Sequence, residues 1–454
     1  MNGGLLPLGW AGIIRLGLVQ TSLGAIIVLT TSTLNRVMVV ELALPAMLPG
    51  LLVGLHHLVQ MSRPRFGYGS DAGGRSTPWI IGGMVVLALG GTGAAVATAL
   101  MGTMPTPGFA LAVVAFILIG LGAGASGTSL LVLLAKRVAA QRKAAAATIV
   151  WIMMIAGFAV TAGLAGHFLD PFSPQRLILV TATVSALAVL VTLLSVRRLE
   201  GAGEAEPTAA CRPAVAALPG FRAALRQVWQ EPEARRFTIF VFVSMLAYSA
   251  QDLILEPFAG AIFGMTPGES TSMAGIQHGG VLLGMLVVAI SGSVTRLGGA
   301  GLLRIWIIGG CLASAAALLG IAFGGSVGPA WPLRANVFAL GVANGTFAVA
   351  AIASMMTLAS NGQGGREGLR MGLWGAAQAI AFGLGGFLGT VAIDIARHFL
   401  AHPPLAYGLV FTGEAALFVV AALLAARVGP SRSLWRSRTP SFGDIATTRI
   451  LEGR

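Results

Sequence analysis

Apolar runs about as long as a bilayer is thick recur through most of this 454-residue chain. A helix needs roughly 20 apolar residues to cross the hydrocarbon core of a membrane. The composition agrees, because 56% of the residues are hydrophobic and only 10% are charged, whereas soluble domains are about 25% charged. The chain is therefore predicted to be an all-α membrane protein, and a soluble globular fold is excluded.

Twelve such runs fall into two sets of six. The predicted spans are 12–32, 42–62, 78–100, 109–134, 146–166, 177–196, 237–257, 274–294, 301–323, 336–358, 371–393 and 405–427. The predicted domains are an N-terminal six-helix bundle (1–196), a cytoplasmic linker (197–236), a C-terminal six-helix bundle (237–428) and a cytoplasmic tail (429–454). Within the linker, 221–229 has helical spacing with arginines on one face, which fits an interfacial helix or a solvated linker helix equally well.

Basic residues gather on one side of these spans. Of the 29 Lys and Arg residues, those predicted on the outer side are Arg36, Arg176, Arg334 and Arg397. Because positive loops stay on the cytoplasmic side of a membrane, both termini are predicted to be cytoplasmic. The same loops explain the net charge of +13, so no nucleic-acid partner is predicted.

The loop after the second span has the residues of a tight inner turn. It reads Gly67-Tyr-Gly-Ser-Asp71-Ala-Gly-Gly74-Arg75, which resembles the G-x-x-x-D-x-x-G-R loop of the major facilitator superfamily. The glycines permit the turn, and the Asp can accept hydrogen bonds from a neighbouring helix N-terminus. The corresponding loop after the eighth span has Arg296 in place of the acid, so the internal repeat is degenerate.

Polar side chains at membrane depth are candidate functional residues, because their desolvation is costly. The candidates are Arg15, Gln20, Asn35, Arg36, Glu41, Gln251, Asp252 and Glu256, together with Arg304 and Glu414.

Each of these has a structural alternative. Asn35, Arg36 and Glu41 are predicted to surround the turn into the second span, where Arg36 and Glu41 also fit an outer-edge ion pair. Asp252 and Glu256 share one face of the seventh span, and Glu256 also fits a hydrated helix end. The arginines at the starts of spans 1 and 9 fit side chains that extend to the inner surface.

The histidines are candidates for a ligand site. His56 and His57 lie within the second span, and His278, beside Gln277, is predicted near the outer start of the eighth. A neutral imidazole can bind a metal or a helix partner, and packing is the commoner role.

Signals for enzymatic chemistry are missing. The two cysteines lie in unlike regions, which argues against a disulfide or a zinc site. Walker and H-E-x-x-H motifs are absent from the sequence, so neither ATP-driven pumping nor an enzyme is predicted.

Three stretches carry a resemblance to a known family. They are Arg15–Gln20 continuing to Thr33–Pro45, then Tyr248–Thr271, then Gln277-His278-Gly-Gly-Val-Leu-Leu-Gly284. Together they resemble the PucC family, also called the bacteriochlorophyll delivery family, of the major facilitator superfamily. The third stretch is most similar to the LhaA branch, which is tied to light-harvesting complex 1.

The resemblance implies a fold of twelve transmembrane helices in two six-helix halves. It implies a role in assembling photosynthetic light-harvesting antenna complexes in a bacterial inner membrane, either cytoplasmic or intracytoplasmic. Bacteriochlorophyll is the implied cofactor or cargo, with carotenoid as a further candidate. The implied partners are antenna polypeptides and membrane lipids, with the reaction centre complex and pigment-synthesis enzymes as further candidates; oligomerisation is left open.

The pigment's central Mg²⁺ needs an axial ligand, for which His278, His56, His57 and Gln277 are the candidates. A carrier of this kind needs an apolar wall, a weak ligand and a lateral opening, and the scarcity of charge at membrane depth fits that design. Two alternatives remain at this point. One is a proton-coupled transporter of a small solute that uses Asp252 or Glu256 as its proton site. The other is a pigment-free membrane chaperone.

Overall fold

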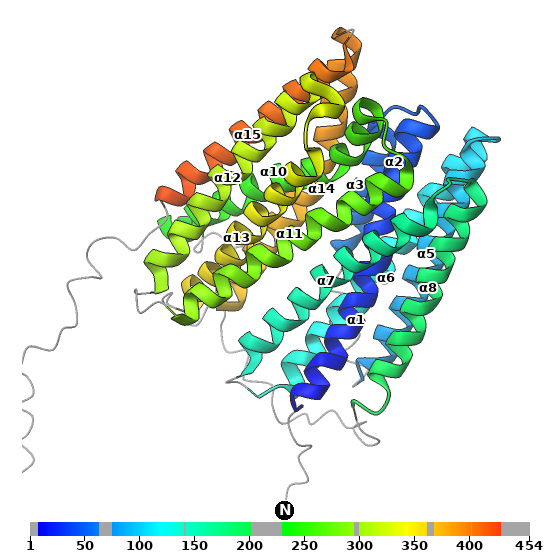
Figure 1. Cartoon of the computed structure of the whole chain (residues 1–454). Helices are drawn as coiled ribbons and strands as arrows, with labels where there is room; N and C mark the ends of the chain where they lie inside the picture. Colours follow the sequence, from blue (N-terminus) through cyan, green and yellow to red (C-terminus); the bar gives the residue numbers. More distant parts are fainter. Residues whose placement is uncertain are drawn as a thin grey trace, which may run out of the picture.

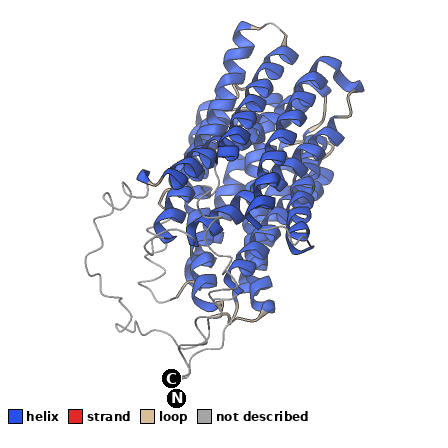
Figure 2. Ribbon diagram, turned by 90° about the vertical axis from the view of Figure 1, so that its left-hand side faces the viewer, coloured by secondary structure: helices blue, strands red, loops and turns tan. Residues whose placement is uncertain are grey.

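The computed structural model describes residues 8–62, 75–139, 142–200, 229–294, 299–360, 367–400 and 402–427. Within these ranges all regular structure is helical (Figure 2). Eleven described helices are long and apolar enough to cross a membrane, and a twelfth apolar helix, Met47–Gln60, is shorter. The prediction of an all-α, multi-pass membrane protein is confirmed.

The helices form two halves that follow each other along the chain (Figure 1). The first half contains α1 (Trp10–Val28) with its continuation, α3 (Met47–Gln60), α5 (Thr77–Met101), α6 (Pro105–Arg137), α7 (Lys143–Leu169) and α8 (Pro174–Val196). The second contains α10 (Pro232–Phe263), α11 (Pro267–Val294), α12 (Gly299–Val327) with the short η5 (Gly328–Ala330), α13 (Leu333–Ser360), α14 (Glu367–Phe399) and α15 (Pro403–Arg427). Helix α10 thus begins inside the predicted linker.

The first span is longer than the sequence predicts. Beyond α1 the helix continues through η1 (Leu29–Thr33), α2 (Leu34–Arg36) and η2 (Val37–Glu41), and the two η segments are π-helical. The prediction that Asn35 and Arg36 surround a turn is wrong, because both lie buried inside this continuous helix. Single π turns within α-helices are frequent at functional sites.

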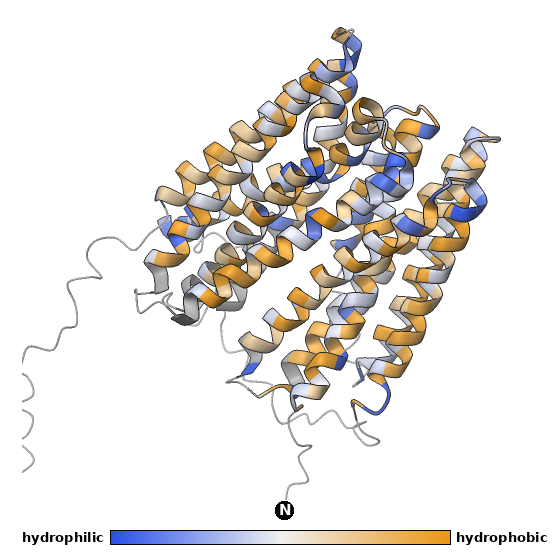
Figure 3. Cartoon of the chain, viewed as in Figure 1, coloured by the Kyte–Doolittle hydropathy of each residue, from blue (hydrophilic) through white to orange (hydrophobic). Residues whose placement is uncertain are grey.

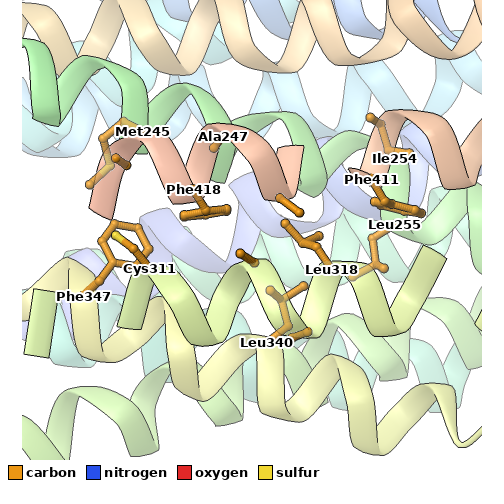
Figure 4. Packing of buried hydrophobic residues seen from close by; sticks show 14 of the residues in the cluster. Met245, Ala247, Ile254, Leu255, Cys311, Leu318, Leu340, Phe347, Phe411 and Phe418 are labelled. Carbon is orange, nitrogen blue, oxygen red and sulfur yellow. The ribbon is translucent and has the colours of Figure 1, made fainter. Parts of the chain in front are cut away.

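Each half has its own apolar core. Figure 4 shows the core of the second half, where Phe347, Phe411 and Phe418 pack with Leu318 and Cys311 between α12, α13 and α15. Hydrophobic residues run along the long helices (Figure 3), and many large apolar side chains are exposed. Such side chains suit contact with lipid.

The halves meet along two helix pairs, α7 with α11 and α3 with α14, and also where the end of the first span contacts α10 and α11. A Cβ built on Gly275 of α11 would lie 2.7 Å from the backbone nitrogen of Gly163 in α7, so the two backbones touch. At the other pair, the carboxylate of Asp394 accepts hydrogen bonds from the backbone N–H groups of Ala46 and Met47, at 3.0 and 2.7 Å. Small residues and polar contacts to the backbone therefore hold the halves together.

Candidate functional site at the contact between the halves

Buried polar side chains of the first span meet α10 and α11 of the other half. We call this set the polar seam: Ser32, Thr33, Asn35, Arg36, Glu41, Glu256 and Thr271, with the carbonyls of Leu253 and Met265. Ser32 donates a hydrogen bond to the Glu256 carboxylate, and the hydroxyls of Thr33 and Thr271 lie 3.0 Å apart. Glu256 is buried, so the alternative of a hydrated helix end is wrong.

Asn35 contacts a carbonyl that its own helix cannot satisfy. In an α-helix the carbonyl of residue 253 would accept from the N–H of residue 257, but that position is Pro257, which has no N–H. The Asn35 side-chain amide donates to the Leu253 carbonyl at 2.6 Å instead. The side chain of Asn35 thus ties α10 to the first half at its internal proline.

Arg36 is the charged member of the seam. Its guanidinium is 2% exposed and lies 2.5 Å from the carboxylate of Glu41, which is 36% exposed. The same guanidinium donates to the carbonyl of Met265, after the end of α10, at 2.6 Å. The ion pair considered from the sequence is therefore present within the first half, and the hydrogen bond from Arg36 to Met265 joins the two halves.

The other membrane-depth candidates are more dispersed. Gln20 donates to the sulfur of Met154 in α7 at 3.1 Å, and Arg15 donates to the carbonyl of Arg197 after α8 at 2.5 Å. Gln251 is buried, with neither amide atom hydrogen-bonded in the structure. Asp252 is partly buried on α10. These residues do not form one site with the seam.

The histidines lie at the two helix pairs that join the halves. His278 lies deeper in α11 than its predicted place at the start of the span, because this helix already begins at Pro267. Its ring is centred 5.0 Å from that of Phe158 in α7, and its Nδ1 is buried without a hydrogen-bond partner.

The α3 histidines contact each other and α14. The rings of His56 and His57 are centred 4.4 Å apart, and the ring of His57 lies 5.9 Å from that of Phe382 in α14. The Nε2 atom of His56 lies 2.5 Å from the amide nitrogen of Gln60. Gln277 is buried on α11, where its backbone carbonyl faces Gly341 of α13. The predicted ligand candidates therefore occupy separate places.

The inner-loop motif is only partly described. Gly67, Asp71, Gly74 and Arg296 lie outside the described residues, as does 221–228 of the proposed interfacial helix. Arg75 lies 3.9 Å from the carboxylate of Glu200, which also accepts from the backbone N–H groups of Ser76 and Thr77 at the start of α5. This contact is confined to the first half.

Glu414 is the buried polar residue for which the sequence provided the weakest indication of a functional role. It lies within α15, is 3% exposed, and neither carboxyl oxygen has a hydrogen-bond partner in the structure. Its helix packs against α10, which carries Asp252. Its position as an isolated acid in the twelfth apolar run was the available signal.

Comparison with known proteins identifies the family of this chain. A family model described as PUCC protein matches residues 33–432. The chain belongs to the PucC family. A Rhodobacter capsulatus protein named bacteriochlorophyll synthase 44.5 kDa chain is 51% identical over 443 residues, which cover 97% of this chain and 100% of that protein. Protein PucC of Rhodobacter capsulatus is 28% identical, with 90% of each chain covered.

Solved structures extend the likeness of this PucC family member to transporters. The nucleoside transporter NupG has a TM-score of 0.63 at 13% identity, with 93% of this chain and 100% of NupG covered. An inward-facing bacterial homologue of the lysosomal transporter Spinster has a TM-score of 0.62 at 14% identity, with 92% and 98% covered. At this identity the likeness shows the fold alone, and it confirms the expected major facilitator superfamily architecture.

Proposed function

We propose that this protein assists assembly of photosynthetic light-harvesting antenna complexes by holding bacteriochlorophyll for insertion into antenna polypeptides. The kinship supports a role in photosynthesis, since relatives bear the names PucC and bacteriochlorophyll synthase 44.5 kDa chain. The proposed location is a bacterial inner membrane with both termini in the cytoplasm. The proposal assigns no catalysis to this chain.

The observation that carries the proposal is that the polar side chains of the seam are bonded across the two halves. Ser32, Asn35 and Arg36 bond to α10 and to the residues just beyond it. These side chains therefore hold the two halves together and are not free to coordinate a water-soluble substrate. What the helices present outward is apolar side chains, which suits a lipid-soluble pigment and hydrophobic antenna helices passed sideways through the bilayer.

Among the histidines, His278 has the environment that best fits an axial ligand. It combines an aromatic neighbour, Phe158, with a buried ring nitrogen that lacks a hydrogen-bond partner. A neutral imidazole with a free nitrogen can coordinate a metal. His56, by contrast, lies at hydrogen-bond distance from Gln60.

The test is deletion and complementation in the native phototroph. We expect deletion to lower the antenna absorption bands of isolated membranes, and a tagged wild-type copy to restore them and to retain bacteriochlorophyll and antenna polypeptides in mild detergent. Unchanged antenna bands in the deletion strain would overturn the assembly role. Restored bands with a colourless, antenna-bound protein would support the pigment-free chaperone instead.

A proton-coupled transporter is the second candidate, and one observation favours it. Asp252 and the buried Glu414 lie on α10 and α15, two helices of the second half that pack against each other, and carboxyls at membrane depth are typical of proton sites. Solute uptake into vesicles that an uncoupler and Asp252→Asn both abolish would support this candidate.

A further inference from the structure

A groove lies between α14 and α15 in the second half, with α10 as its floor, and these three helices pack against one another (Figure 1). Leu388 of α14 and Leu409 of α15 line the groove and are 50% and 61% exposed. Exposed apolar faces of this kind meet lipid in a membrane, so the groove opens sideways into the bilayer. Glu414 also belongs to the lining, but both its carboxyl oxygens are buried, and the surface that the groove presents is therefore hydrocarbon.

The groove is long and narrow. Along α14 its lining runs from Gly385 to Phe399, which is about 20 Å of helix and slightly more than the roughly 15 Å of hydrocarbon in one leaflet of a bilayer. Its volume of about 720 Å³, spread over this length, gives a mean cross-section of about 35 Å². An α-helix with its side chains is about 10–12 Å wide and needs more than twice that area. The groove therefore has room for a single hydrocarbon chain and not for a helix.

Gly413 keeps the α15 wall of the groove open. Its helix packs against α10 and α12, yet a Cβ built on Gly413 would meet no atom within 4 Å. This glycine is therefore not needed for close helix packing, and it lines the groove. A larger side chain at this position would fill the groove without pressing on another helix.

A basic residue stands at one end of the groove. Arg397 lies in the last turn of α14, is exposed, and comes directly after Ala396, which lines the groove. Leu400, which also lines the groove, follows Arg397 by three positions, and residues three apart are neighbours on a helix surface. Since the apolar span of α14 ends at Phe399, Arg397 stands at the depth where lipid head groups begin.

Arg397 differs from the other arginines predicted on the outer side of the membrane. Those three have partners in the protein: Arg36 with Glu41, Arg334 with Glu269, and Arg176 with the carbonyl of Asp170. Within the part of the chain that the structure describes, Arg397 has neither a hydrogen bond nor an ion pair. Asp394, one turn earlier, already accepts from the backbone N–H groups of Ala46 and Met47. Because basic residues are scarce on the outer side of a membrane, this unpaired one beside a lipid-facing groove indicates an anionic ligand.

We propose that the groove binds one acyl chain of an anionic phospholipid, with the lipid phosphate on the Arg397 guanidinium. The guanidinium is a planar fork that matches phosphate oxygens in pairs, and the apolar lining suits the chain. Charge and shape select the same occupant, an anionic head group at the membrane surface whose chain extends through one leaflet. This site goes beyond the proposed function, because it needs neither pigment nor antenna polypeptides.

Native mass spectrometry of the purified full-length protein measures the affinity for the first bound lipid. The protein is titrated with dioleoyl phosphatidylglycerol, which is anionic, and with dioleoyl phosphatidylcholine, which has the same chains and no net charge. We expect the wild-type protein to bind phosphatidylglycerol about fivefold more tightly, the effect of one basic residue near an anionic lipid. Arg397→Ala should abolish this preference, and Arg397→Lys should keep most of it. Gly413→Leu should weaken the binding of both lipids by about tenfold, because the acyl chain loses its apolar contacts.

Two matched controls sharpen the result. Arg176→Ala removes an exposed arginine that lies away from the groove. Gly309→Leu adds the same side chain to an exposed glycine of α12, where a built Cβ also meets no atom within 4 Å. Both controls should bind the two lipids as the wild-type protein does. Gly413→Leu should melt at the same temperature as Gly309→Leu, and this separates lost binding from lost folding.

Each contrary result overturns a stated part of the site. Equal affinity of the wild-type protein for the two lipids, or an unchanged preference in Arg397→Ala, would overturn the contact with the head group. Unchanged lipid binding by Gly413→Leu would overturn the groove as the place of the acyl chain. If that variant instead retained fewer antenna polypeptides when purified from the phototroph, the groove would be a protein-docking face. Failure of the lipid site would leave the proposed function standing, since the antenna absorption bands of the deletion strain test that function.

Discussion

Asn35 donates its side-chain amide to the carbonyl of Leu253, the one carbonyl of α10 that Pro257 deprives of its helical donor. The bond crosses between the two halves. One contact therefore supplies the missing donor for this carbonyl and also fixes α10 against the first span. A proline within a membrane helix is tolerated only where the freed carbonyl finds another donor. Here the donor comes from the opposite half of the molecule.

Asn35→Ala should lower the free energy of unfolding by about 1–3 kcal/mol, because it leaves a buried carbonyl unsatisfied. In a Pro257→Ala background residue 257 regains its N–H, and the same change should cost less than about 1 kcal/mol. Denaturant unfolding in mixed micelles measures both. Asn336→Ala is the matched control, because Asn336 also donates to a helix carbonyl, that of Ala317, which Ile321 can still satisfy. An equal cost in both backgrounds would contradict this account.

The Arg36–Glu41 ion pair should contribute more to the free energy of unfolding than an ordinary surface ion pair does. Glu41→Ala leaves a buried guanidinium whose remaining acceptor in the described structure is the Met265 carbonyl. We expect the free energy of unfolding to fall by about 1–3 kcal/mol, less than for a fully buried pair because Glu41 is partly exposed. The exposed Arg75 is the control, and Arg75→Ala should cost about 0.5 kcal/mol or less. Thermal melting in detergent compares the two. Comparable losses would show that Arg36 is solvated.

The sequence predicted the helices well because long apolar runs in a membrane have few alternatives. It failed at the end of the first span, where Asn35 and Arg36 look like the polar residues of a loop. Their partners in the other half, the carbonyls of Leu253 and Met265, lie more than 200 positions away, and hydropathy along the chain carries no such information.

Close backbone contact between α7 and α11 predicts a sharp difference between two glycines of one helix. A side chain at Gly275 would press on the backbone of Gly163 and Ala159, whereas one at Gly279 would meet no atom within 4 Å. Gly275→Val should therefore cost about 1–3 kcal/mol by overpacking, and Gly279→Val should change stability little. Melting temperature and antenna absorption of complemented cells report on both. Equal tolerance would mean that the halves are not held by this contact.

His278 provides the most direct test of the proposed pigment ligand. His278→Ala in the complemented phototroph should lower the bacteriochlorophyll that co-purifies with the protein by roughly tenfold, the effect of losing about 1.4 kcal/mol of binding free energy. His167→Ala is the matched control, because that ring also lies against a phenylalanine, Phe168, but at the exposed end of α7. The pigment-to-protein absorbance ratio of the purified protein gives the measurement. If the two variants retain equal pigment while remaining folded, His278 is a packing residue, and the axial ligand must be sought elsewhere in the membrane-embedded part of the chain.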